Sequence, residues 1–195
     1  ATPNSATYTL VCEEPAMDGF TGFKTAAAEE LPDAVAVLDP FHVVRLAGEA
    51  LDKCRRRVQQ HTLGHRGRKG DPLYGARRTL STGAGLLTPK QRTRLEKLFA
   101  DDAHVEVEVT YGVYQKMVTA YRAKDPADGK RVMEELIASL TTGVPRVLTE
   151  LITLGRTLKR RAADVLAYFD RPGTSNGPTE ALNGRLEHLR GSALG

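Results

Sequence analysis

The chain has 195 residues, of which 41% are hydrophobic and 27% charged, values typical of a folded globular protein. It contains no run of about 20 apolar residues, which argues against a membrane-embedded class. We also expect no signal peptide, since the first ten residues lack its charged and apolar regions. The two cysteines form no Cys-x-x-Cys pair, so we expect neither a disulfide scaffold nor a cysteine zinc site, and a cytoplasmic location.

The net charge of +4 is unevenly distributed along the chain. Residues 1–44 contain seven acidic residues and one basic residue, whereas residues 45–78 contain ten basic residues and three acidic ones. This arrangement suits a cation-binding centre followed by a polyanion-binding surface. An uneven but merely solvated surface explains the charges equally well.

The first 40 residues predict an acid, a helix, a strand and a second acid. Asp18 stands on an Asp-Gly turn, and a helical period follows over residues 21–31. Residues 34–38 (AVAVL) are a short apolar run, typical of a strand buried on both faces, and the run ends at Asp39. Chemistry collects at the carboxyl ends of strands in open α/β sheets, which makes Asp18 and Asp39 candidate site residues. Roles in a turn and in a helix cap are equally compatible with the pattern.

Residues 41–172 are predicted to be almost entirely helical. The first helix begins at Phe41, and an apolar stripe that includes Phe41, Leu51 and Cys54 would face the core. Thr88 and Pro89 mark another helix start, because threonine caps helices and proline fits the first turn. The other segments with a helical period are 74–80, 104–122, 128–140, 144–155 and 158–169.

A basic loop is predicted over residues 61–72, which contain three glycines, three basic residues and two histidines. Such a loop suits contacts to phosphates, which supply affinity without sequence preference.

The last segment predicts a short helix that begins near Pro178. Leucines at 182, 186 and 189 form an apolar stripe, and Glu180 and Asn183 lie on a separate polar face. A carboxylate in the first turn is favoured by the helix dipole in any protein, so Glu180 alone would more often be structural than functional.

Two runs of the sequence together resemble the DDE transposases of bacterial insertion sequences, in the group called ISL-three. They are AMDGFTGFKTAAAEELPDAVAVLDPFHVVRLAGEALDKCRRRV and DVLAYFDRPGTSNGPTEALNGRLEHLRGSALG. The most specific parts are the Asp-x-Phe-His element at Asp39 and the Thr-Ser-Asn-Gly-x-Thr-Glu-x-x-Asn element that contains Glu180. The similarity covers residues 16–195.

The resemblance implies an α+β, mostly α fold: a partial ribonuclease H-like core with a large all-helical insertion. Residues 16–40 would belong to the core, residues 41–172 would be the insertion, and residues 173–195 would contain the core helix with the last catalytic acid. Residues 1–15 do not match the family. The implied activity is DNA strand cleavage and strand transfer by two-metal phosphoryl transfer.

The resemblance also implies the site. Asp18 and Glu180 would be the catalytic acids and the ligands of Mg²⁺ or Mn²⁺, and Asp39 would be a further possible ligand. Two such ions activate the attacking hydroxyl and neutralise the leaving oxygen, so no general base is required. The supporting residues would be His42, Asn176 and Asn183.

DNA, as transposon ends and target, is the implied partner, beside a second copy of the chain or the intact transposase. Basic side chains would hold the DNA backbone. They are Arg55, Arg56, Arg57, Arg66, Arg68, Lys69, Arg77, Arg78, Arg185 and Arg190.

One departure from the family concerns activity. No aspartate precedes Asp18, although the family pattern has its first catalytic aspartate on an earlier strand. We therefore expect a truncated transposase with little activity alone. The alternative is a non-catalytic DNA-binding or regulatory remnant that uses the basic helical region. A third possibility is a helical partner-binding domain, if the acidic and basic segments neutralise each other within the fold.

Overall fold

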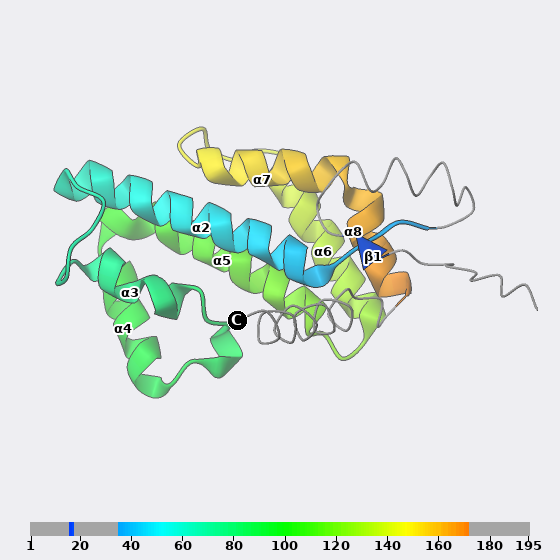
Figure 1. Cartoon of the computed structure of the whole chain (residues 1–195), viewed down its shortest axis with the longest axis horizontal. Helices are drawn as coiled ribbons and strands as arrows, with labels where there is room; N and C mark the ends of the chain where they lie inside the picture. Colours follow the sequence, from blue (N-terminus) through cyan, green and yellow to red (C-terminus); the bar gives the residue numbers. More distant parts are fainter. Residues whose placement is uncertain (1–15, 18–34, 172–195) are drawn as a thin grey trace, which may run out of the picture.

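The computed structural model describes residues 16–17 and 35–171 of the chain. These residues are mostly helical, as predicted (Figure 1). The long helices α2 and α5 lie side by side, α7 packs on α2, and α6 packs on α5 and α7. The helices are α2 (Pro40–Leu63), α3 (Pro72–Leu80), α4 (Pro89–Phe99), α5 (Val105–Tyr121), α6 (Pro126–Thr141), α7 (Thr149–Arg160) and α8 (Ala162–Asp170), with 3₁₀ turns η1 (Ala84–Leu86) and η2 (Asp102–His104).

Two short strands pair in parallel, β1 (Ala16–Met17) and β2 (Val37–Leu38). Val37 and Leu38 are 0% and 2% exposed, which confirms the expected burial of this strand, and β2 packs against α8. The strand is shorter than the predicted 34–38, and Val35 is exposed. A ribonuclease H-like core remains an inference from the family resemblance.

Helix α2 begins where the sequence places a cap and a proline. The Asp39 carboxylate accepts a hydrogen bond from the Phe41 backbone N–H at 2.7 Å, and Pro40 needs no donor partner in the first turn. The helix ends at Gly64, whose φ of 71° is left-handed. Over its 24 residues it is about 36 Å long at 1.5 Å per residue.

The face of α2 that enters the core is partly different from the prediction. Leu51 and Cys54 are buried as expected, but Phe41 is 64% exposed and the neighbouring His42 is buried instead. The first turn of α2 directly follows strand β2, and the Asp39 cap sets its orientation. The helical period of the later turns therefore does not determine which side chain of the first turn is buried.

Helices α6 and α7 approach closely because Gly155 lies between them. A Cβ at this position would be 2.9 Å from the backbone carbonyl carbon of Leu140, closer than real Cβ contacts. Gly155 lies in the middle of α7, although the sequence predicts that a helix ends there.

The other predicted boundaries are partly correct. The capping box at Thr88 is confirmed, since its hydroxyl and the Gln91 side chain each bond the other's backbone N–H. The prediction of a helix from residue 144 is wrong: residues 144–148 form a turn, closed by the Leu148 N–H on the Pro145 carbonyl, and α7 starts at Thr149. No helix of the described ranges is both long and apolar enough to cross a membrane.

Candidate functional site

The parallel strands β1 and β2 are each followed in the sequence by a predicted acidic residue. Ala16 pairs with Val37 and Met17 with Leu38, so both strands end together. Asp39 follows β2 directly, is 3% exposed and caps α2. The structure therefore places Asp39 at the junction of strand, helix cap and core.

His42 and Tyr121 surround Asp39 from two helices. The His42 Nδ1 lies 3.8 Å from the Asp39 Oδ1, one helical turn further along α2. Tyr121 is the last residue of α5, and burial, followed by the charges of Tyr168 and Asp39, raises its pKa well above the usual tyrosine value. The hydroxyl therefore stays protonated near neutral pH.

Both of these neighbours have polar atoms without hydrogen-bond partners. The His42 Nδ1 and the Tyr121 hydroxyl are buried and unpaired within the described residues. Sequence reasoning named His42 but missed Tyr121, because nothing in its helical spacing links the end of α5 to the end of β2.

The described residues alone do not complete a metal site. Over residues 16–17 and 35–171, no group of three or more His, Cys, Asp or Glu side chains could hold a metal ion. Asp39 has the hard carboxylate oxygens that Mg²⁺ prefers, but one of them accepts the cap hydrogen bond. A cation here would need donors from outside these ranges, and the predicted metal ligands Asp18 and Glu180 both lie there. The other predicted site residues outside the described ranges are Asn176, Asn183, Arg185 and Arg190.

Two of the predicted DNA-binding arginines of α2 pair with the same acid, Asp52. Arg55 has a 6% exposed side chain, and its guanidinium binds Asp52 at 2.7 Å and Gln59 at 3.3 Å. Arg56 is half exposed and pairs with the other Asp52 oxygen at 2.9 Å.

Arg57 joins three helices. It donates two hydrogen bonds to Glu150 of α7, at 2.8 and 2.9 Å, and lies 2.7 Å from Glu106 of α5. The hydrogen bonds that Arg57 donates to Glu150 are the largest cause that raises the pKa of Arg57, and burial opposes it. Burial raises the pKa of Glu150. Hydrogen bonds to the carboxylate, above all those from Arg57, and the positive charge of Arg57 together lower it by more, so the pKa of Glu150 is below its usual value.

The other predicted basic residues of the described ranges are exposed and lie far from Asp39. Figure 1 shows that the loop between α2 and α3 lies at the opposite end of α2 from β1. The exposed residues there are Arg66, Arg68, Lys69, Arg77 and Arg78. The structure thus separates Asp39 from this basic loop by the length of α2.

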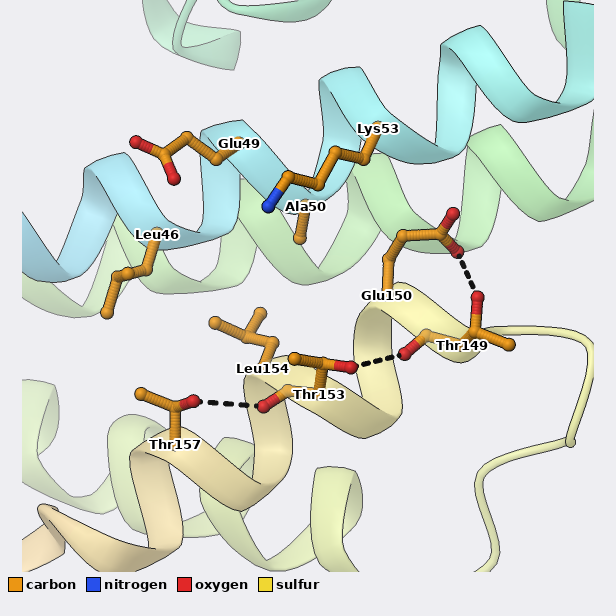
Figure 2. A pocket seen from close by; sticks show the side chains of 9 residues that line it. All are labelled: Leu46, Glu49, Ala50, Lys53, Thr149, Glu150, Thr153, Leu154 and Thr157. Atoms are coloured by element: carbon orange, nitrogen blue, oxygen red, sulfur yellow. Dashed lines mark hydrogen bonds between the residues drawn. The ribbon is translucent and has the colours of Figure 1, made fainter.

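A groove of about 220 Å³ between α2 and α7 lies apart from both (Figure 2). Its three threonine hydroxyls are occupied: Thr153 donates to the Thr149 carbonyl, Thr157 to the Thr153 carbonyl, and Thr149 to the Glu150 carboxylate. Glu150 in its wall is held by Arg57. Asp39, the one predicted metal-binding residue within the described ranges, does not line this groove.

The model of the ISL-three (ISL3) group of DDE transposases, described as "Transposase", matches residues 10–195. No curated protein matches, and no solved structure matches.

Proposed function

The chain belongs to the ISL-three family of transposases, and we propose that it contributes the metal-dependent site for DNA strand cleavage and strand transfer. The observation that supports this most is the parallel pairing of β1 with β2. Carboxyl ends of parallel strands meet at one edge of a sheet, where α/β proteins place their chemistry. An aspartate follows each of these strands directly in the sequence, Asp18 after Met17 and Asp39 after Leu38.

In this proposal Asp18 and Glu180 hold the divalent cations, and Asp39 lies beside them. Mg²⁺ or Mn²⁺ would activate the attacking hydroxyl and neutralise the leaving oxygen. Asp39 joins β2 to α2 through its cap bond to Phe41, and His42 lies against the same carboxylate. Both would keep the strand end in position while DNA binds.

Metal binding tests the proposal without requiring turnover. Mn²⁺ affinity is measured by electron paramagnetic resonance for the full chain and for Asp18→Asn, Glu180→Gln and Glu108→Gln. Glu108 is an exposed acid of α5 and serves as the matched control. We expect the first two changes to weaken Mn²⁺ binding at least tenfold and the control to leave it unchanged. Equal Mn²⁺ affinity in all four proteins would refute the proposal.

Nicking of a supercoiled plasmid in Mn²⁺ adds a chemical readout. We expect slow nicking by the chain alone, lost in Glu180→Gln and retained in Glu108→Gln. Nicking that survives Glu180→Gln would assign the reaction to another site.

A second candidate, a DNA-binding regulator without catalysis, is favoured by the exposed basic residues at the far end of α2. It predicts DNA affinity that falls steeply with salt and is the same in EDTA, in Mg²⁺ and in Asp18→Asn. Such a chain would act in the cytoplasm on DNA ends, or pair with the intact transposase or with a second copy.

A further inference from the structure

The loop between α2 and α3, residues 64–71, has a backbone that its sequence specifies in detail. Gly64, Gly67 and Gly70 have φ values of 71°, 124° and 109°, a region that residues with a side chain rarely adopt. A Cβ on Gly67 would also lie 2.6 Å from Cδ2 of Tyr74, because the loop backbone lies directly on that ring. Glycine is thus required at 67 for two reasons.

Polar groups on the inner side fix the loop. The Asp71 carboxylate accepts a hydrogen bond from the Arg68 backbone N–H at 2.6 Å and one from the Gln59 side chain at 3.4 Å. The Gly67 N–H donates to the His65 ring at 3.2 Å. Gln59 is completely buried in α2, so the loop is anchored to the helical core.

The cationic side chains of this loop take no part in these anchoring hydrogen bonds. Arg66, Arg68 and Lys69 are exposed, and none of them forms an ion pair with an acid of the described ranges. The one acid of the loop, Asp71, is turned inward and occupied. The loop therefore presents three charges on a fixed backbone, and no acid of residues 35–171 forms an ion pair with them.

Helix α3 extends the same surface. The Arg77 guanidinium lies 4.2 Å from the centre of the Tyr74 ring and donates to the Tyr74 carbonyl at 2.9 Å, so its position is set in advance. Arg78 beside it is exposed. Between this surface and Asp39, by contrast, two of the three exposed cations of α2 are paired, Arg45 with Glu49 and Arg56 with Asp52, and Lys53 is the third.

We propose that the basic clamp, defined as residues 64–71 together with Arg77 and Arg78, is a preformed site for the phosphates of duplex DNA, about one turn of B-DNA away from Asp39 at the end of β2. Helix α2 separates the two places by about 36 Å at 1.5 Å per residue, and one turn of B-DNA is about 34–36 Å. A clamp that is already ordered loses little conformational entropy when it binds. The proposal rests on the proposed function for the acidic end, but its own ligand is the DNA backbone and requires no metal.

Salt-dependent binding tests the clamp. The affinity of the full chain for a duplex of about 20 base pairs is measured by fluorescence anisotropy in EDTA, for the wild type and for a triple variant. The variant is Arg66→Ala, Arg68→Ala and Lys69→Ala. Since each phosphate contact contributes about 0.9 to the slope of log affinity against log salt, the slope should fall by about 2.7. A control with three exposed cations removed elsewhere should keep the wild-type slope: Lys116→Ala, Lys124→Ala and Arg146→Ala.

A change that keeps every charge tests preorganisation. Gly67→Ala should weaken duplex binding about fivefold or more, while Gly85→Ala, where a Cβ meets open space, should have no effect. Circular dichroism before and after heating tests whether both variants are folded. Unchanged affinity in a folded Gly67→Ala protein would overturn the preformed loop.

Duplex length tests the spacing. Extension from about 10 to about 20 base pairs should raise wild-type affinity more than that of the triple variant, because the longer duplex spans one turn beyond the first contact. An equal rise in both proteins, or equal clamp dependence for single-stranded DNA or RNA, would overturn the proposal. If Mn²⁺ binding is insensitive to Asp18→Asn and Glu180→Gln while these results hold, the proposed catalysis fails and the clamp stands.

Discussion

Arg57 offers the sharpest test of how this helical region is held together. Its guanidinium binds Glu150 through two hydrogen bonds and lies 2.7 Å from Glu106, so one side chain joins α2, α5 and α7. Arg57→Ala would leave two carboxylates close together, with side chains only 24% and 11% exposed for Glu106 and Glu150. We expect the protein to be clearly less stable.

The size of the effect follows from burial. An exposed ion pair contributes about 0–1 kcal/mol, whereas loss of one partner of a fully buried pair costs about 3–5 kcal/mol. The Arg57 side chain is 35% exposed, so we expect an intermediate loss of about 2–3 kcal/mol. For a chain of this size that corresponds to a fall in Tm of roughly 4–12 °C.

The pH dependence has a definite sign. The folded-state pKa of Glu150 is lowered, so its contribution to stability is present above the unfolded value and is lost as pH falls through the folded value. The difference between wild type and Arg57→Ala should therefore be constant near neutrality and shrink as the pH falls below the ordinary value of 4.5.

Urea unfolding followed by circular dichroism at pH 7 and at acidic pH measures both effects. Arg56→Ala is the matched control, because that neighbouring arginine is 51% exposed and pairs with an equally exposed Asp52; it should cost less than about 1 kcal/mol. If Arg57→Ala unfolds like the wild type but binds duplex DNA less tightly, then the arginine serves DNA and the reasoning from the triad is wrong.

Three further predictions concern single contacts, each measured by thermal unfolding. Gly155→Ala should cost about 1–3 kcal/mol, because its methyl group would meet the Leu140 backbone; unchanged stability would show that α6 and α7 can separate freely. Thr88→Ala removes half of a capping box and should cost about 1 kcal/mol, and a gain in Tm would contradict the cap. Tyr114→Phe should cost about 1 kcal/mol, since the Tyr114 hydroxyl donates to a backbone carbonyl at 2.8 Å. Tyr121→Phe should be neutral or stabilising, because the buried Tyr121 hydroxyl has no hydrogen-bond partner within the described ranges. A larger loss of stability in Tyr121→Phe than in Tyr114→Phe would refute this comparison.

Local signals in the sequence were sufficient for most helix starts. Asp39-Pro40 and Thr88-Pro89 each combine a capping side chain with a proline in the first turn, and helices begin at Pro40 and Pro89. These signals act over two or three residues and need no tertiary contact. For that reason they can be interpreted from the sequence alone.

Two boundaries were wrong because tertiary contacts determine them. Gly155 predicts a helix end from its low propensity, but here it allows two helix backbones to approach, and α7 continues to Arg160. Val144-Pro145 suits a helix start as well as a turn, and the buried Leu148 keeps the apolar spacing through a turn. Spacing alone does not distinguish these cases.

The predicted cations could not be sorted by sequence in the same way. One basic segment of the sequence contains Arg55, Arg57 and Arg66. The first two form ion pairs with acids of the fold, whereas Arg66 forms no ion pair with an acid of the described ranges. The partner of Arg57 lies 93 positions away in the chain. Only the packing of α2 on α5 and α7 shows which cations are occupied.

Helix α2 accounts for the separation of acidic and basic functions. The sequence changes from an acidic to a basic segment at about residue 45. Helix α2 is continuous from Pro40 to Leu63, so its length of about 36 Å lies between Asp39 and the start of the loop at Gly64. At such a distance, well beyond the screening length of about 8 Å at physiological salt, the basic clamp does not alter the charge balance around Asp39. Cations next to paired carboxylates would compete with a divalent metal, so under the proposed function a remote clamp would hold DNA phosphates without weakening metal binding at the strand ends.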